Sequence, residues 1–122
     1  MKVLLSIKPQ FAVKIFDGTK KFEFRKSIFK NSKINTVVVY ASSPIQKVIG
    51  EFTFDEIIEE HPEVVWEKTK NHSGISKEFF DEYFLNRDKA FAIRVKETNQ
   101  YKIPMDLIDF DLNFAPQSFV YL

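Results

Sequence analysis

The sequence predicts an α+β fold that is mainly β, with a small curved or closed sheet and short helices covering its ends. Two observations predict it. Short β-branched or alternating segments recur along the whole chain, whereas segments with helical spacing are few and short. The helical segments also fall between the strands instead of forming a block of their own. The chain has 122 residues, which is the length of one domain, and we expect residues 1–122 to form a single one.

The N-terminal segment predicts a strand and then a short helix. Residues 3–7 form a short apolar run that is typical of a buried strand. Pro9 stands at a position suited to the first turn of a helix, and apolar residues within 10–17 recur at helical spacing. Gly18 follows directly, where helices commonly end. Residues 20–26 then alternate with a period of two, which predicts a second strand.

The middle of the chain predicts two further strands joined by a turn. Residues 36–41 form a nearly continuous β-branched run, which we expect to be a central strand. Ser42, Ser43 and the proline after them predict a turn, and residues 48–54 return as the next strand. Gly50 inside that strand predicts a bulge or a close approach of two backbones.

Two helices are predicted next. Pro62 indicates the start of the first, which we expect to end before Gly74. Ser76 is the expected cap of the second, because its hydroxyl can accept from a backbone N–H of the first turn. The second helix has an aromatic face that we expect to lie entirely in the core. This face consists of Phe79, Phe80, Tyr83 and Phe84.

The last third of the chain predicts strands and one helical turn. Residues 90–95 form a strand, and residues 101–103 are expected to continue it after a turn at Asn99. Residues 104–108 predict a single helical turn. The tail ends as a strand that we expect to pair back into the sheet.

Composition excludes several classes of protein and site. Hydrophobic residues make up 44% of the chain and 14 residues are Phe, which predicts a packed core and excludes a disordered chain. No apolar run approaches the ~20 residues that span a bilayer, and we expect a cytoplasmic protein with no membrane partner. The chain has no cysteine, and its two histidines, His61 and His72, lack metal-ligand spacing. We therefore expect no metal and no cofactor.

Charge is unevenly distributed along the chain. Residues 1–50 carry ten Lys or Arg against two acids, whereas residues 51–122 carry eight against fifteen acids. This asymmetry is consistent with one basic surface for a polyanion. The alternative is that the two halves interleave in the fold and their charges pair. The sequence leaves both open, because no run of like charge is long.

One short stretch, residues 18–26, gathers a single carboxylate among four cations on a predicted strand. We expect this cluster to lie on the surface, at the rim of a cleft. The carboxylate is Glu23, and the cations are Lys20, Lys21, Arg25 and Lys26.

Three side chains of this stretch suit nucleic-acid recognition. Lys20 supplies a compact ammonium, and Arg25 supplies a planar fork that fits a phosphate or a base edge. Glu23 accepts hydrogen bonds from base N–H groups or acts as a general base, and the flanking cations favour its ionised, accepting form. The alternative is that Glu23 and Arg25, two apart on one strand, simply pair with each other.

The spacing of these residues resembles a family motif. Gly18, Lys20, Glu23 and Arg25 fit the pattern G-x-K-x-x-E-x-R of the ASCH domains, a branch of the PUA-like superfamily. The Lys-Pro pair before the first helix, the helix that carries the only Trp and the terminal Pro-Gln-Ser-Phe are also similar to that family. The resemblance therefore covers essentially the whole chain. It implies a PUA-like fold, a small β-barrel closed by helices, with a cleft beside the first helix.

The resemblance also implies a function. Members of the superfamily bind RNA or modified nucleobases, and a few ASCH proteins are hydrolases or nucleases. We therefore predict a nucleic-acid-binding module that holds RNA or a modified nucleobase in a basic cleft around Lys20, Glu23 and Arg25. The predicted partner is RNA or a modified nucleoside. The predicted ligand-binding residues are Lys8, Lys20, Glu23, Arg25, Ser42, Ser43, Trp66, Gln117 and Ser118.

Two other functions stay open. The first is a hydrolase acting on a modified nucleoside or on RNA, with Lys20 and Glu23 as candidate catalytic residues. The family's hydrolases that remove an acyl group from a modified cytidine resemble a Lys-Thr-Glu arrangement, with Thr at the place of Glu23, which disfavours that activity here. The second is a regulatory module that senses a small ligand or another protein. Whether the chain is an enzyme is therefore left open by its residues.

Overall fold

The computed structural model describes residues 1–122. It contains six strands and three α-helices, and two short 3₁₀ helices complete it. The strands are β1 (Lys2–Ile7), β2 (Phe22–Arg25), β3 (Thr36–Ala41), β4 (Lys47–Glu60), β5 (Ala90–Met105) and β6 (Phe119–Tyr121). The helices are α1 (Pro9–Phe16), α2 (Pro62–Thr69), η1 (Lys70–His72), α3 (Lys77–Tyr83) and η2 (Leu107–Phe110).

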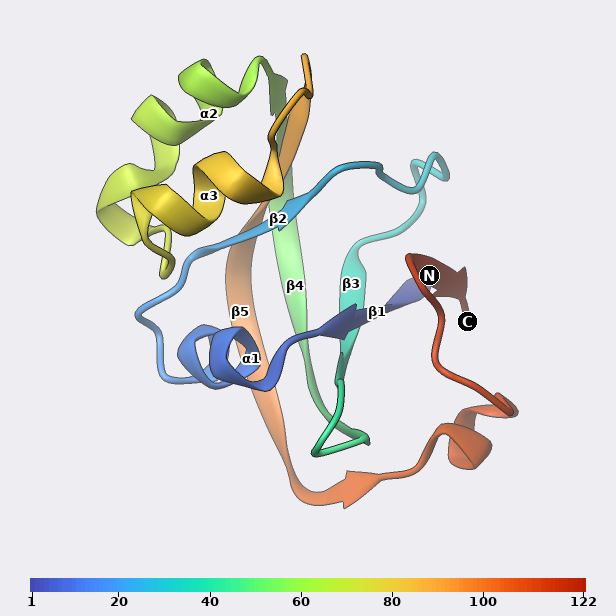
Figure 1. The fold of residues 1–122 in the computed structure, drawn as a ribbon. Coiled ribbons are helices and arrows are strands. Elements are labelled where there is room, and N and C mark those ends of the chain that lie inside the picture. The colour runs from blue at the N-terminus through green and yellow to red at the C-terminus, as the bar shows by residue number, and fades with distance from the viewer.

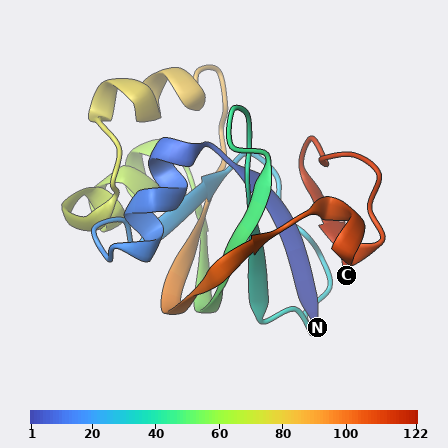
Figure 2. The same ribbon diagram turned by 90° about the horizontal axis from the view of Figure 1, so that it is seen from below.

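The six strands form one sheet in the order β2-β5-β4-β3-β1-β6. All neighbours are antiparallel except β1 and β3, which the crossover through α1 makes parallel. The sheet curls into a half-barrel with α1, α2 and α3 toward one side (Figure 1). Figure 2 shows the same curl from below, with the C-terminal segment away from the helices. The predicted curved sheet with short covering helices is confirmed.

The C-terminal strand pairs with the N-terminal strand. β6 pairs antiparallel with β1, as predicted, and the N–H of Leu122 donates to the carbonyl of Lys2 at 3.1 Å. The two edges of the sheet are β2 and β6. None of the helices combines the length and the apolar content needed to cross a bilayer.

Two core clusters fix the helices on the sheet. Ala12 and Ile15 of α1 pack in the larger cluster, against the inner residues of β1 and β3. Phe80 and Phe84 pack in the second cluster, which joins α2 and α3 to β2 and β5. Phe24 of β2 belongs to the second cluster and meets the Phe80 ring edge to face at 5.2 Å. β2 is therefore held under α3.

Most predicted elements are confirmed within a residue or two, including the caps. Ser76 accepts a hydrogen bond from the backbone N–H of Phe79, and Gly18 has a φ of 89° just past the end of α1, both as predicted. At the start of α2, His61 likewise accepts from the backbone N–H of Glu63. Gly50 is confirmed as a close approach. A Cβ there would lie 2.7 Å from the backbone oxygen of Asn99 and 2.6 Å from Cζ of Phe16, and the β3–β4 and β4–β5 registers both shift near it.

Two predictions for the last third of the chain are wrong. β5 runs without a turn through Asn99, which pairs with Glu51 of β4. The helical turn predicted at 104–108 begins only at Leu107, because Pro104 is still part of β5. Pro104 is tolerated there since the β4–β5 register shifts next to it and no ladder N–H is needed. β4 is likewise longer than predicted and continues to Glu60.

Candidate functional site

A cavity of about 200 Å³ opens between α1, β2 and α3, beside the end of β1. Its walls are half apolar, and three of its six polar lining residues, Lys20, Glu23 and Arg25, come from the stretch that carries the motif. The lining residues are Ser6, Ile7, Lys8, Phe11, Lys20, Glu23, Phe24, Arg25, Ile75, Phe79, Tyr83 and Gln117.

Lys20 is the most buried charge of the chain, with an exposed fraction of 1%. Its ammonium donates to the carbonyl of Ser73 at 2.8 Å and lies 4.5 Å from the ring centroid of Phe24 and 5.4 Å from that of Phe11. Burial lowers the pKa of Lys20 to about 8, although the nearby Glu23 carboxylate favours the charged form. The amine therefore changes protonation close to neutral pH.

The backbone around Lys20 is fixed by the segment that leads into α3. Three hydrogen bonds run to three successive carbonyls of that segment. The backbone N–H of Lys21 donates to His72, the ammonium of Lys20 donates to Ser73, and the ammonium of Lys14 donates to Gly74. Gly74 has a φ of 68°, and a Cβ there would lie 2.4 Å from Cβ of Lys20. Only glycine permits this contact, so the position of α3 over the cavity depends on it.

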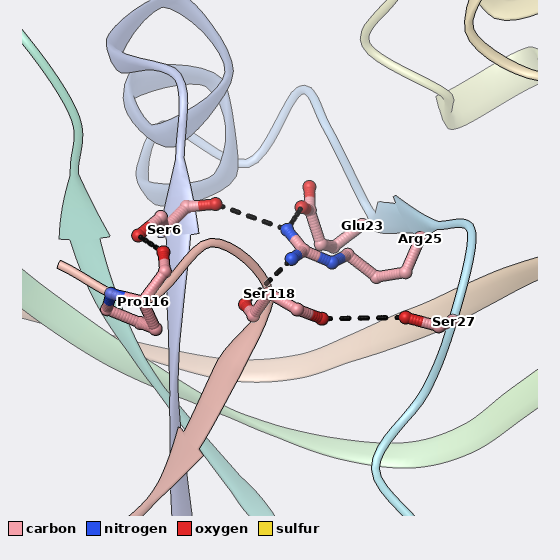
Figure 3. Close-up of polar contacts among 6 residues, drawn as sticks. All are labelled: Ser6, Glu23, Arg25, Ser27, Pro116 and Ser118. Atoms are coloured by element: carbon pink, nitrogen blue, oxygen red, sulfur yellow. Dashed lines mark hydrogen bonds and ion pairs between the residues drawn. The ribbon is translucent and has the colours of Figure 1, made fainter.

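Arg25 joins the motif to the opposite edge of the sheet (Figure 3). Its Nη1 donates to Oε2 of Glu23 at 3.3 Å and to the carbonyl of Ser6 on β1 at 3.1 Å, and its Nη2 donates to the carbonyl of Ser118 at 2.9 Å. The predicted pairing of Glu23 with Arg25 is therefore present. Arg25 bridges β2 to β1 and to the segment before β6, and three of its contacts are already made within the chain.

The expectation that this cluster lies on the surface is wrong for its two central residues. Glu23 has an exposed fraction of 5% and Lys20 of 1%. The reason is tertiary, because α1 and α3 lie on two sides of β2 (Figure 1). The charged face of this short edge strand therefore becomes the floor of a cavity. Each buried charge has a partner, as the desolvation cost of a buried charge requires.

An aromatic wall faces these charges, and it was not predicted. Phe11 of α1 and Phe79 of α3 meet edge to face at 5.0 Å, and the Phe79 and Tyr83 rings lie 17° from parallel. Phe79 and Tyr83 were expected in the core with Phe80 and Phe84, but only the latter two are buried there. The sequence does contain a signal for two faces, because Phe79 and Tyr83 are four residues apart and share one face of the helix. That face is rotated by one residue from the face that carries Phe80 and Phe84. Burial raises the pKa of Tyr83.

The remaining predicted site residues divide into two groups. Lys8 and Gln117 line the cavity, whereas Ser42, Ser43 and Trp66 do not. The N–H of Ser42 donates to the carbonyl of Ile7 directly after the last β1–β3 pair, and the carbonyl of Ser42 accepts from the N–H of Ile45 in the turn that follows. Trp66 packs on Phe80 with ring centroids 5.0 Å apart. Ser118 contributes its carbonyl to Arg25, and its hydroxyl lies 3.5 Å from that of Ser27 (Figure 3). No group of three or more His, Asp or Glu side chains is arranged to hold a metal ion.

A second depression, which we call the outer hollow, lies where β2 meets β4, β5 and α2. Two of its cations, Arg94 and Lys68, are exposed and pair with acids on the surface, whereas Lys21 is exposed and forms no ion pair. Arg94 lies 3.8 Å from Asp55 and 3.6 Å from Glu56, and Lys68 lies 3.5 Å from Glu60. The lining residues of the outer hollow are Lys21, Phe22, Glu56, Ile58, Lys68, His72, Arg94 and Val95.

Comparison with known proteins shows which structures this architecture resembles. The crystal structure of ASCH from Zymomonas mobilis superimposes with a TM-score of 0.90 at 25% identity, over 99% of this chain and 87% of that one. A protein named "ASCH domain-containing ribonuclease" from Zymomonas mobilis is 27% identical over 99% of this chain and 84% of its own length. The chain is therefore similar to ASCH proteins over almost its whole length, in sequence and in fold. No protein-family model matches it.

The chain also matches part of a longer protein. A chain named "Large ribosomal subunit protein uL22" from Ureaplasma parvum serovar 3 is 32% identical over 98% of this chain. This chain spans only 39% of that protein's length. The four positions of the ASCH motif, Gly18, Lys20, Glu23 and Arg25, here serve as the end of α1, the buried ammonium, the acceptor and the bridging guanidinium.

Proposed function

We propose that this ASCH domain is an RNA-binding module that takes one nucleobase, plain or modified, into the cavity between α1, β2 and α3. The observation that carries the proposal is a buried ammonium and a buried carboxylate, Lys20 and Glu23, side by side in a cavity with an aromatic wall. Aromatic rings stack on any base, and adjacent donors and acceptors read a base edge. The relative from Zymomonas mobilis that is named a ribonuclease supports an RNA-related function.

Both charged groups keep hydrogen-bonding capacity for a ligand. Arg25 donates to Oε2 of Glu23, and no protein group donates to its Oε1. The ammonium of Lys20 has three donors, and Ser73 accepts only one of them. A base that presents an N–H beside a carbonyl or ring nitrogen would satisfy both. Gln117, also in the lining, adds an amide that donates or accepts.

The size of the cavity favours a base over a whole nucleotide. A volume of 200 Å³ corresponds to the space of roughly seven waters at about 30 Å³ each. Pockets for drug-sized ligands are larger, about 300–1,000 Å³. The sugar and its phosphates would therefore stay outside the cavity, and the base would have to be unpaired and unstacked to enter.

The test compares Glu23→Gln with wild type for binding of short single-stranded RNAs and free nucleosides. The amide keeps the shape of the side chain but replaces the charged acceptor. We expect affinity to fall by roughly tenfold or more, the value of a hydrogen bond to a charged group at about 1.5–3 kcal/mol. Glu56→Gln in the outer hollow is the matched control and should bind as wild type does. Equal affinities for Glu23→Gln and wild type would contradict the proposal.

A second candidate function is cleavage of RNA. Two observations favour it: the relative named a ribonuclease, and the pKa of Lys20, which burial lowers to about 8. Glu23 would take the proton of a ribose 2′-hydroxyl, the 2′-oxygen would attack the adjacent phosphorus, and Lys20 would protonate the leaving 5′-oxygen. The products would be a 2′,3′-cyclic phosphate and a free 5′-hydroxyl. Labelled RNA incubated with wild type and Glu23→Gln tests this, since only wild type should yield the cyclic end, and a 2′-deoxy substrate should resist cleavage.

A further inference from the structure

Lys20 and Glu23 line the cavity without forming an ion pair with each other. The carboxylate of Glu23 pairs with Arg25 at 3.3 Å, and the ammonium of Lys20 donates to the carbonyl of Ser73 at 2.8 Å. An ionised carboxylate only accepts hydrogen bonds, and an ammonium only donates them. The cavity therefore offers acceptors at one residue and donors at the other, and neither residue can exchange its role by rotation as an amide or a hydroxyl can.

The carboxylate of Glu23 is held in place with both oxygens open to a ligand. Arg25 donates to Oε2, and no protein group donates to Oε1. The guanidinium is itself fixed by the carbonyls of Ser6 and Ser118, so it keeps the carboxylate from turning. Each carboxylate oxygen accepts more than one hydrogen bond, so Oε2 also retains capacity. Two neighbouring N–H groups of a ligand can therefore donate to the two oxygens at once.

Of the four RNA bases, only guanine has two neighbouring N–H groups beside an acceptor on its Watson–Crick edge. Its N1–H and its N2 amino group lie next to the O6 carbonyl. Uracil has one N–H between two carbonyls, and adenine and cytosine each have one amino group beside an accepting ring nitrogen. A carboxylate that meets one of these three bases edge-on gains a single hydrogen bond, and its second oxygen faces an acceptor of the base. Guanine is therefore favoured by attraction, and the other bases are disfavoured by repulsion.

We propose that the cavity selects guanine, with the N1–H and the N2 amino group on the carboxylate of Glu23 and O6 on the ammonium of Lys20. This inference rests on the proposed function and names its ligand. The rings of Phe79 and Tyr83, in the same lining, supply the surface on which the base stacks, and a purine covers more of it than a pyrimidine does. A Watson–Crick pair covers the edge that the site reads, so the guanine must lie in a single strand.

The experiment compares labelled strands of a few uridines that differ only in one central base. Inosine lacks only the N2 amino group of guanosine, and we expect wild type to bind the inosine strand about tenfold or more weakly than the guanosine strand. Strands with a central adenine or cytosine should also bind more weakly. 7-Deazaguanine lacks only N7, which the proposed contacts do not use, and should bind as guanine does. Fluorescence anisotropy measures each affinity.

Three variants assign the contacts. Glu23→Gln replaces one accepting oxygen with a donating amide, so the guanine and inosine strands should bind about equally. Lys20→Met removes the donor to O6, which both bases carry, so it should weaken both strands and preserve their ratio. Glu56→Gln in the outer hollow is the matched control and should keep the wild-type ratio. A thermal melt of each variant verifies that the fold is intact.

Two outcomes separate this inference from the proposed function. If wild type binds the guanine and inosine strands equally while Glu23→Gln still weakens binding of both, guanine selection is wrong and the base cavity stands. Tighter binding of the adenine or cytosine strand than of the guanine strand would overturn guanine selection in the same way. If wild type binds none of the strands, both the inference and the proposed function are wrong.

Discussion

The cavity and the outer hollow flank the same short strand, β2, but their charged side chains differ in burial. In the cavity, Lys20 and Glu23 are buried and each is bonded to a fixed partner. In the outer hollow, Arg94 and Lys68 are about half exposed and pair with acids at 3.5 Å or more. Buried charges carry a desolvation cost and exposed pairs contribute little, so only the cavity combines fixed geometry with strong electrostatics.

This difference indicates which of the two regions is the candidate functional site. A buried ammonium whose pKa is lowered by burial, beside a carboxylate in a cavity, is a candidate site on physical grounds. The cations of the outer hollow lie on the surface of the same sheet and show no comparable arrangement. Charge alone does not distinguish the two regions, because each has cations around β2.

The largest expected contrast is between two arginines. Arg25→Ala removes a guanidinium that donates to Glu23 and to the carbonyls of Ser6 and Ser118, and we expect it to lower the free energy of unfolding by about 3 kcal/mol. Arg94→Ala removes two long, exposed ion pairs and should lower it by about 0.5 kcal/mol or less. Urea denaturation of both variants measures the difference. Equal losses would mean that Arg25 does not bridge the two edges of the sheet.

The next contrast is the pH dependence of stability. The pKa of Lys20 is lowered to about 8 in the folded chain, so above that pH the unfolded chain binds more protons and stability rises with pH. We expect the free energy of unfolding to rise by about 2 kcal/mol between about pH 7 and about pH 9.5. At higher pH the tyrosines oppose this rise, because burial raises their pKa values in the folded chain.

Two variants isolate this effect. Lys20→Met should abolish the rise, since it removes the titrating group and keeps an unbranched side chain of similar length. Lys68→Met in the outer hollow should leave the rise intact, because that ammonium is about half exposed. Chemical denaturation at a series of pH values measures both. A rise that survives Lys20→Met would assign it to another group.

The smallest contrast is between two aromatic residues. Tyr83→Ala should weaken binding of single-stranded RNA by about 1.5 kcal/mol, roughly tenfold, because it removes a stacking surface from the cavity. Tyr83→Phe should keep most of that affinity. Trp66→Phe should leave affinity unchanged, since Trp66 packs on Phe80 outside the cavity. Fluorescence anisotropy with a labelled RNA measures all three, and a larger loss for Trp66→Phe would identify a different stacking residue.

Local pattern was sufficient to predict much of the fold. The β-branched run of β3, the Pro and Gly that bound α1 and the cap of α3 are each specified by adjacent residues. The length of β5 is not. It continues through Asn99 and Pro104 because β4 pairs with it and the register shifts beside the proline, and no local signal contains that pairing.

The site was predicted from spacing, and its environment was not. The motif identified Lys20, Glu23 and Arg25, which line one cavity. Their burial depends on α3, which lies more than 50 residues further along the chain and is positioned by the contact of Lys20 with Gly74. The aromatic wall was missed because one helix has two aromatic faces, and only packing distinguishes the face in the core from the face in the cavity.

The most direct test of the central claim is a titration of the isotope-labelled chain with short single-stranded RNA, followed by amide chemical shifts. The base cavity predicts that the largest saturating shifts occur at Lys20, Glu23, Tyr83 and Gln117, which surround one volume. Shifts confined to Glu56, Lys68 and Arg94 would place the RNA in the outer hollow and contradict the account.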